Sequence, residues 1–424
     1  MSDSISSITT DRRIRIAGGG QLPGEVRLPE LAGVQPANDP ALDTVGRLLG
    51  DARLLAGSSV VGGAALGASL AGGGPLRRVG GVIGGAAAGV VGALLALRAM
   101  EMTNGRGSSS TTAYVADLPA ASTTPRRGEH GESLTVMDWN VRDLIGPDGH
   151  IRSNDAAIDV IAETVAREQP DVLVLQEVGE GTIQGAMRNN LAELAERLGA
   201  TDAVLVPNGR RAGGSAKGGA ILTFGDAKIQ DARGLRHADP GGDGTLRRIG
   251  AALGPLRLAG VDLPEWVPRG YMPRTTADAV VTTSGGNDVR VMGVHLSGAV
   301  DQDDDVDTIG RLQREQVGSL ITSLDAWQGP TIIAGDFNIR DTSSSFTWER
   351  EHLGSAGMRD ALTAAGIRPG DPARYSHPTP DPSKGIDRTY VSEHFDVATA
   401  RVMHDDDARE GSDHLPTVIE LTIR

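Results

Sequence analysis

Two polar side chains follow a short apolar run in the C-terminal third of the chain. The segment TIIAGDFNIRD, residues 331–341, places Asp336 and Asn338 directly after Gly335. A short apolar run that ends at a glycine is typical of a buried strand, and residues i and i+2 of a strand point to the same face. We therefore expect Asp336 and Asn338 to share a face at a strand end, where open α/β sheets commonly carry their chemistry.

The same arrangement recurs along the C-terminal part of the sequence. Strand-like runs end or begin at six further polar residues, Asn140, Glu177, His295, Asp387, Asp413 and His414. One such carboxylate is commonly a turn residue or a helix cap, but a series of them with two histidines indicates one shared site. The oxygen donors suit a hard cation such as Mg²⁺, and an imidazole beside it suits proton transfer or a charged transition state.

These residue types could hydrolyse a phosphodiester. That reaction needs a cation to take up developing negative charge, a carboxylate to prepare the attacking water, and an acid for the leaving alkoxide. The cluster supplies all three.

The elements that must position this site have the pattern of an α/β domain over residues 132–424. Apolar residues recur at helical spacing in 154–168, 184–199 and 306–327. Residues 225–273 are apolar but broken by Pro and Gly, and we expect an inserted surface excursion there. The strand-like runs are LTVMDWN, DVLVLQE, AVLVP, GAILTF, ADAVVTT, VRVMGVHL, TIIAGDF, IDRTYVS and LPTVIELTI.

The N-terminal part has a different composition. Residues 1–53 are polar with scattered Pro and Gly and are predicted to be mostly disordered. Residues 54–76 and 79–97 carry no charge. Two readings stay open for 54–99, a membrane-associating helical hairpin with a glycine-lined face and a Gly/Ala-rich tether. Residues 100–131 are rich in Ser, Thr and Pro and read as a linker.

Charge and composition narrow the classes of function. The chain has a net charge of −14, with about +2 before residue 131 and −16 after it. A polyanionic substrate would therefore need local basic loops or a bound cation. Cysteine is absent, so any metal must be held by oxygen or imidazole. The first residues lack an apolar stretch behind their charges, and we expect no cleavable secretory signal.

The combination of LQE after an Asn-ending strand, GDFN, and SDHLP near the C-terminus resembles the endonuclease/exonuclease/phosphatase superfamily over residues 132–424. The resemblance implies a four-layered α/β sandwich of two packed mixed β-sheets flanked by helices. It further implies that Glu177, with Asn140 and Asp413, holds Mg²⁺ or Mn²⁺. Asp336 and Asn338 would orient water and phosphate. His414, aligned by Asp387, would serve as acid/base or stabilise charge, and His295 would grip a nonbridging oxygen.

Several basic residues are candidates for substrate phosphate. Arg274 stands where family members often carry a phosphate-facing arginine, and Arg142 and Arg388 accompany the WNVR and IDR segments. Arg210, Arg211 and Lys217 could form a nucleic-acid-binding loop or be ordinary surface charge. Position 142 is Arg where the repair-nuclease branch has Asp, which argues against a second metal. Lys217 replaces an acid that orients the first histidine in some members, so the sequence leaves the partner of His295 open.

Three functions remain open from the sequence. The HLS and GDFN contexts favour a nuclease, with DNA favoured over RNA. The acidic domain, the scarcity of lysine and the few aromatic residues argue against a nuclease, and the alternative is a phospholipid, sphingomyelin or inositol-phosphate hydrolase of the same fold. A membrane-associated interaction protein with a degenerate catalytic domain is the weakest reading, because no expected site residue is missing. A delivered bacterial toxin or effector, or a membrane-associated enzyme, would explain the uncharged 54–97 segment by analogy.

Overall fold

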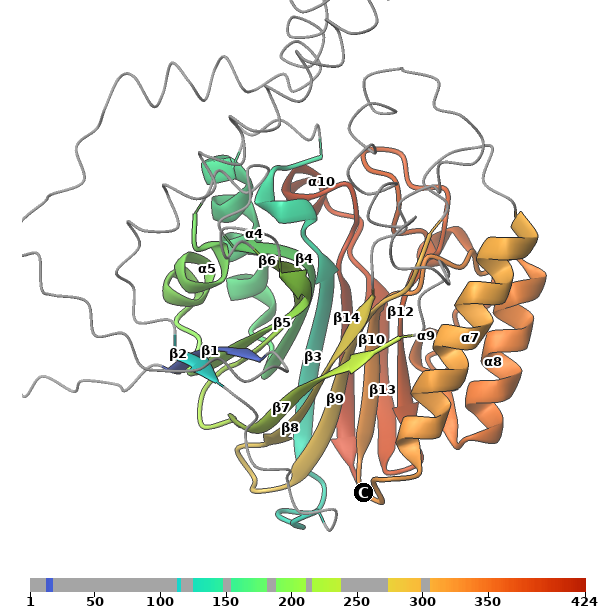
Figure 1. Ribbon diagram of the computed structural model, residues 1–424, viewed down its shortest axis with the longest axis horizontal. Coiled ribbons are helices and arrows are strands. Elements are labelled where there is room, and N and C mark those ends of the chain that lie inside the picture. The colour runs from blue at the N-terminus through green and yellow to red at the C-terminus, as the bar shows by residue number, and fades with distance from the viewer. Residues whose placement is uncertain are drawn as a thin grey trace, which may run out of the picture.

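The computed structural model describes residues 125–147, 154–180, 188–210, 216–237, 274–298 and 306–424, and the backbone of 13–17 and 113–115 (Figure 1). The predicted membrane-associating segment 54–97 lies outside these residues, as do most of 1–53 and of the linker. Among the described helices, none combines the length and the apolar character needed to cross a membrane. Arg211 and residues 238–273 also fall outside the described ranges.

The described residues form two β-sheets. The eight-stranded sheet has the order β13-β14-β3-β4-β6-β5-β1-β2, and the six-stranded sheet has the order β11-β12-β10-β9-β8-β7. Both sheets mix parallel and antiparallel pairs. The strands are β1 (Arg13–Ala17), β2 (Ala113–Val115), β3 (Ser133–Asn140), β4 (Val172–Glu180), β5 (Asp202–Arg210), β6 (Ala216–Thr223), β7 (Lys228–Arg236), β8 (Thr275–Thr282), β9 (Asp288–His295), β10 (Thr331–Asp336), β11 (Met358–Asp360), β12 (Asp387–Ser392), β13 (Phe395–Val402) and β14 (Thr417–Ile423).

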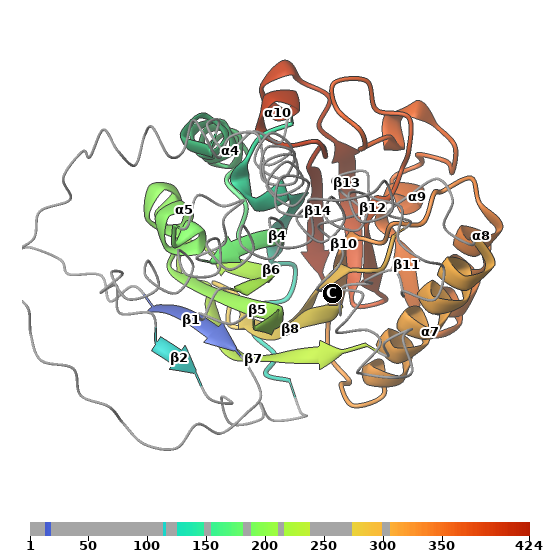
Figure 2. The same ribbon diagram turned by 45° about the horizontal axis from the view of Figure 1, so that its top comes forward.

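The main core lies between the two sheets, which pack face to face (Figure 2). Val174 of β4 and Ile221 of β6 belong to the same buried cluster as Ala277 of β8 and Val291 of β9. Strands β9, β10 and β12 are buried along their whole length, and β10 accordingly carries the continuous apolar run IIAG.

Helices cover the outer faces of both sheets, which gives four layers. Helices α4 (Asn154–Glu168), α5 (Asn190–Leu198) and α10 (Asp406–Gly411) lie on the side of the eight-stranded sheet, and α7 (Val306–Leu324) and α8 (Ser344–Ser355) on the side of the other (Figure 1). Val317 and Leu320 of α7 pack with Val294 and Ile333 in a second core cluster. The remaining helical turns are η1 (Arg142–Leu144), α9 (Ala361–Ala364) and η3 (Pro372–Arg374). The predicted sandwich of two mixed sheets flanked by helices is confirmed.

The structure differs from the predicted organisation in particular places. Residues 228–236, predicted as part of a surface excursion, form β7 and pair with β8, so that prediction is wrong for this stretch. Residues 125–131, assigned to the linker, are hydrogen-bonded to the turn between β8 and β9 through Arg126, Gly128 and Glu129. The backbone of 13–17 pairs with β5 and with β2, two strand contacts that the sequence did not indicate.

Candidate active site

Three strands of the six-stranded sheet bring three predicted residues into one row. Asp336 lies opposite His295 of parallel β9 on one side and opposite Asp387 of antiparallel β12 on the other. Two of these strands therefore end at the site and the third begins there. Gly335 has a φ of 146°, and a Cβ at this position would lie 2.0 Å from the Val294 carbonyl oxygen. Only glycine fits directly before Asp336.

Asp336 accepts three hydrogen bonds from the residues around it. Its Oδ1 accepts from the Asn338 backbone N–H at 2.8 Å, and its Oδ2 accepts from the amides of Asn338 at 3.1 Å and Asn140 at 3.2 Å. Asn140 ends β3, so this last bond links the two sheets. The structure thus brings Asp336 and Asn338 together, as their spacing predicts. Burial, with added repulsion from Asp387, raises the pKa of Asp336 to about 7.

Glu177 is aimed by an irregularity in β4. The pairing of β4 with β6 shifts register between Leu175 and Val178, and Glu177 has a φ of 59°. A bulge of this kind redirects a side chain and is common beside active sites. Glu177 Oε2 accepts a hydrogen bond from Lys217 Nζ at 2.6 Å, and Oε1 lies 3.8 Å from His295 Nε2. Although burial opposes ionisation, Lys217 and His295 hold the pKa of Glu177 well below its usual value.

The segment after Asn140 supplies Asp143, the second carboxylate that Lys217 contacts. Arg142, Asp143 and Leu144 have φ values of 44°, 56° and 59°, a left-handed turn that costs roughly 1–2 kcal/mol per non-glycine residue. Backbone strain of this kind is found at functional sites. The turn buries Asp143, whose Oδ2 accepts from Lys217 Nζ at 2.6 Å. Arg142 lies over Asp413, with its Nε 3.3 Å from Asp413 Oδ2.

His414 and Asp387 form the most strongly polarised pair. His414 Nδ1 donates to Asp387 Oδ2 at 2.8 Å, and the Ser376 hydroxyl donates to the same oxygen at 2.5 Å. Although burial opposes protonation, Asp387 and then Asp336 raise the pKa of His414 to about 10. His414 Nε2 lies 3.9 Å from Asp336 Oδ2. The imidazole is therefore a cation at neutral pH and can donate a proton from Nε2.

Arg274 is the partner of His295 that the sequence left open. Its guanidinium Nη1 lies 3.0 Å from His295 Nδ1. Because a guanidinium can only donate, Nδ1 accepts, and the ring proton of the neutral imidazole is on Nε2. Burial and the charge of Arg274 lower the pKa of His295 well below its usual value. His295 Nε2 faces Asp336 Oδ2 at 3.5 Å and is in place to donate to a phosphoryl oxygen.

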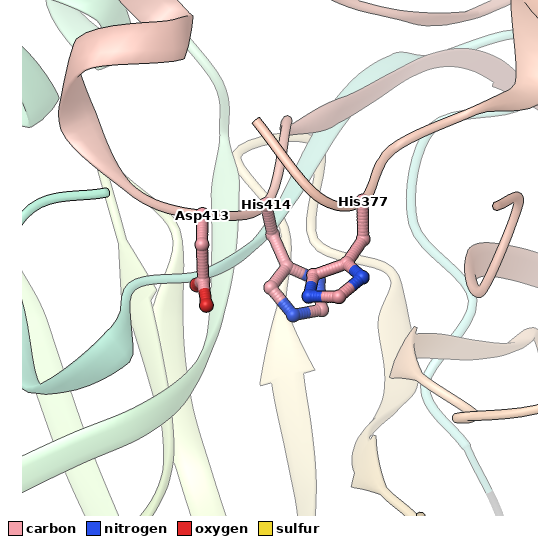
Figure 3. Close-up of side chains that lie close together, drawn as sticks. All are labelled: His377, Asp413 and His414. Atoms are coloured by element: carbon pink, nitrogen blue, oxygen red, sulfur yellow. The ribbon is translucent and has the colours of Figure 1, made fainter. Parts of the chain in front are cut away.

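His377 joins the site without having been predicted. Its ring packs on that of His414, with 4.5 Å between centroids and 46° between planes, and Asp413 lies beside both (Figure 3). It comes from the segment between η3 and β12, whereas Asp413 and His414 immediately precede β14. The sequence signal that could have indicated His377 was its position ten residues before Asp387, where β12 begins.

Some predicted phosphate contacts are wrong. Arg388 is fully buried, with Nη1 3.3 Å from Glu349 Oε1 and Nη2 donating to the Ile339 carbonyl, so it cannot reach a substrate. Lys217 points into the acidic site rather than out of a nucleic-acid-binding loop. Arg211 and the side chain of Arg210 are outside the described part of the chain.

Ser297 of the HLS segment and Phe337 of the GDFN segment, the two contexts that favour a nuclease, are buried. Ser297 is held beneath α7, where its N–H donates to Gln316 Oε1 and its hydroxyl accepts from Gln316 Nε2. Phe337 packs on Tyr390 with 5.6 Å between ring centroids. Both therefore act through packing, not through contact with a substrate.

The residues present fit a hard divalent cation. The predicted ligands Asn140, Glu177 and Asp413 offer oxygen only, and Glu177 is held ionised. Asp336 and Asp387 add two further buried carboxylates beside these ligands, and a divalent ion would offset their repulsion. Glu177 is in neither of the two carboxylate and imidazole groupings, His377–Asp413–His414 and Asp336–Asp387–His414, that approach within 4.8 Å among the described residues.

The sequence matches a model of the Endonuclease/Exonuclease/phosphatase family over residues 139–414. The chain belongs to this family. Members of the family are hydrolases of phosphoester bonds. No curated protein matches the chain.

Solved structures of similar fold include family proteins from two bacteria. One, from Beutenbergia cavernae DSM 12333, is 22% identical, with 69% of this chain and 72% of that chain covered and a TM-score of 0.47. One from Bacteroides thetaiotaomicron is 18% identical, with 70% and 97% covered and a TM-score of 0.48. The human Nocturnin catalytic domain with bound sulfate is 16% identical, with 71% and 97% covered and a TM-score of 0.46.

Proposed function

We propose that residues 125–424 form a Mg²⁺-dependent phosphodiesterase and that it acts as an endonuclease on DNA. The observation that carries the phosphodiesterase is the row of His295, Asp336 and Asp387, set by strand register and completed by His414. Every site residue that the family resemblance predicts is present in the sequence, which argues against a degenerate domain without catalytic activity.

The chain's own residues account for the proton and charge movements. Asp336, with a pKa of about 7 and Asn338 beside it, accepts a proton from the attacking water. His295 Nε2–H donates to a nonbridging phosphoryl oxygen, and Arg274 fixes that tautomer. His414, cationic and held by Asp387, stabilises charge on the phosphoryl group or protonates the leaving oxygen. When bound at Glu177, the metal would act as a Lewis acid on the phosphate.

Support for a nucleic acid comes from the resemblance rather than from substrate contacts. The WNVR, HLS and GDFN segments resemble the deoxyribonuclease branch, as the sequence indicates. The competing function is a phospholipid or inositol-phosphate hydrolase of the same fold, and the acidic charge of the domain argues against DNA as the substrate. A bound cation offsets that charge locally but not over long distances, so DNA cleavage should fall steeply with added salt.

One assay tests this proposal against its competitor. The full chain with Mg²⁺ is given plasmid DNA, single-stranded RNA, sphingomyelin and phosphoinositides side by side. We expect nicking of the plasmid first, internal cleavage, and weak or no lipid hydrolysis. Lipid hydrolysis with a plasmid that stays supercoiled would replace the nuclease by a lipid phosphodiesterase.

Membrane association is a separate proposal. It is supported by the two uncharged stretches within residues 54–97, whose lengths approach the roughly 20 residues that span a bilayer. A full-length chain that stays with membranes after a carbonate wash would support it. A wholly soluble monomer would favour the tether.

A further inference from the structure

His377, Asp413 and His414 form a cluster of metal-ligating groups that the proposed hydrolysis does not use as a unit. Each offers one ligand atom, and these atoms lie within 4.8 Å of one another. The two imidazole rings lie against each other, with the Asp413 side chain next to His414 (Figure 3). We propose that this cluster binds a divalent cation of the late first transition row, such as Zn²⁺, and that the bound ion inhibits the enzyme.

The donor set selects the class of ion. Two imidazoles with one carboxylate suit Zn²⁺ and its transition-metal neighbours, whereas Mg²⁺ prefers oxygen ligands alone. The predicted catalytic ligands near Glu177 offer no imidazole. One site can therefore hold two kinds of cation at separate positions, with Asp413 as the side chain they share.

Both histidines have a nitrogen prepared for a ligand. His414 Nδ1 is engaged by Asp387 at 2.8 Å, and this carboxylate–histidine bond is the arrangement that orients a metal-bound imidazole through its other nitrogen. His377 Nδ1 is buried and has no hydrogen-bond partner within the described residues.

The charges around the cluster favour a cation. Asp387 Oδ2 lies 2.8 Å from His414 Nδ1 and Asp336 Oδ2 lies 3.9 Å from His414 Nε2, and both carboxylates attract a divalent ion. Arg142, which contacts Asp413 Oδ2, is partly exposed and can move toward solvent.

The second grouping, Asp336–Asp387–His414, is a weaker candidate. Its Asp387 and His414 are already hydrogen-bonded to each other, and the Ser376 hydroxyl donates to the same Asp387 oxygen. This grouping offers one imidazole and two carboxylates, whereas the grouping of His377, Asp413 and His414 offers the two imidazoles that suit a late transition metal.

Inhibition follows from the ligand that the two functions share. An ion on His414 Nε2 occupies the nitrogen that the hydrolysis uses. Zn²⁺ should therefore inhibit even when Mg²⁺ is saturating, because its two imidazole ligands are not ligands of Mg²⁺ and Asp413 alone is shared.

The binding test uses Zn²⁺ alone as the probe, by calorimetry in saturating Mg²⁺ on the full chain. His377→Phe keeps an aromatic ring against His414 and removes both nitrogens, and His377→Asn is a second variant. We expect each to weaken Zn²⁺ binding by about tenfold or more. His352→Phe, at an exposed histidine of α8, is the matched control and should bind Zn²⁺ as the parent does.

A spectroscopic arm reports the ligands directly. Co²⁺ in place of Zn²⁺ should give visible absorption bands that depend on His377. Parental Zn²⁺ affinity in both His377 variants would overturn the proposal, and so would Co²⁺ bands that survive in them.

The inhibition arm rests on the proposed nuclease. Zn²⁺ should inhibit plasmid nicking by the parent and by His352→Phe, with the inhibitory concentration raised about tenfold or more in His377→Phe. Equal inhibition of all three would overturn the regulatory claim. A chain that binds Zn²⁺ through His377 yet cuts no plasmid would overturn the nuclease and leave the metal site standing.

Discussion

The two halves of the site treat their carboxylates in opposite ways. In the acidic half, made of Asn140, Asp143, Glu177 and Lys217, an ammonium group bridges two carboxylates at 2.6 Å each. In the histidine half, made of Asp336, Asp387, His377 and His414, the fixed cation is an imidazolium. The pKa of Glu177 is lowered and that of Asp336 is raised to about 7. The first half is therefore organised to bind a cation and the second to exchange protons.

The largest effects are expected in the histidine half. Asp336→Asn and His414→Ala should each lower turnover by roughly a hundredfold or more, since proton transfer by a positioned group contributes that much. Plasmid nicking rates and circular dichroism are measured together. The control is Asp396→Asn. Asp396 is exposed, forms an ion pair with Arg424, and lies opposite Thr422 at the end of β14 that is far from the site. Turnover within a few-fold of the parent, with an unchanged spectrum, would place the chemistry elsewhere.

Glu177 should show the next largest effect, on the metal rather than on the proton. Glu177→Gln keeps the size of the side chain and removes one charge, so we expect Mg²⁺ affinity to fall by about tenfold or more. Titration calorimetry without substrate measures it. An unchanged Mg²⁺ affinity would mean that Glu177 is not a metal ligand. The acidic half would then not be the cation-binding half of the site.

Lys217 should shift the same affinity in the opposite direction. Lys217→Met removes a positive charge from between Glu177 and Asp143, and less repulsion of a divalent ion should tighten Mg²⁺ binding on the order of tenfold. Lys228→Met changes the net charge equally but lies exposed on β7, which makes it the matched control. Weaker Mg²⁺ binding in Lys217→Met would mean that Lys217 is needed to hold Glu177 in its ligating position.

The site was predictable where it depends on strand ends and not where it depends on irregular backbone. His295 and Asp336 were found because they end buried strands and Asp387 because it begins one, and strand register then places the three side by side. The contact between Asp143 and Lys217 depends on three consecutive residues with left-handed backbone angles. No periodic pattern in the sequence predicts such a turn.

Burial explains most of the errors. A charged residue such as Arg388 is ordinarily expected at the surface. In the fold its guanidinium is buried and pairs with Glu349 of α8, a helix that the sequence did not predict. Only the tertiary fold brings these two residues together. Strand β7 was missed for a related reason, because its burial alternates and its sequence, KIQDARGLR, has few apolar residues.

The smallest expected effect compares two glutamates three residues apart on β4. Lys217 and His295 keep Glu177 ionised, whereas burial raises the pKa of Glu180 to about 8, against a lowering by the backbone N–H of Leu191. Between the ordinary glutamate pKa and about 8 the folded chain holds a proton that the unfolded chain releases. The free energy of unfolding therefore falls as pH rises through this range.

Glu180→Gln keeps an oxygen that accepts from Leu191 and cannot ionise. The variant should consequently lose this pH dependence, and its stability relative to the parent should be greater at pH 9 than at pH 5. Urea unfolding of both proteins at the two pH values measures the difference. A margin that is the same at both would mean that Glu180 is already ionised in the folded chain, and the two glutamates would then not differ in protonation although only Glu177 has a neighbouring cation among the described residues.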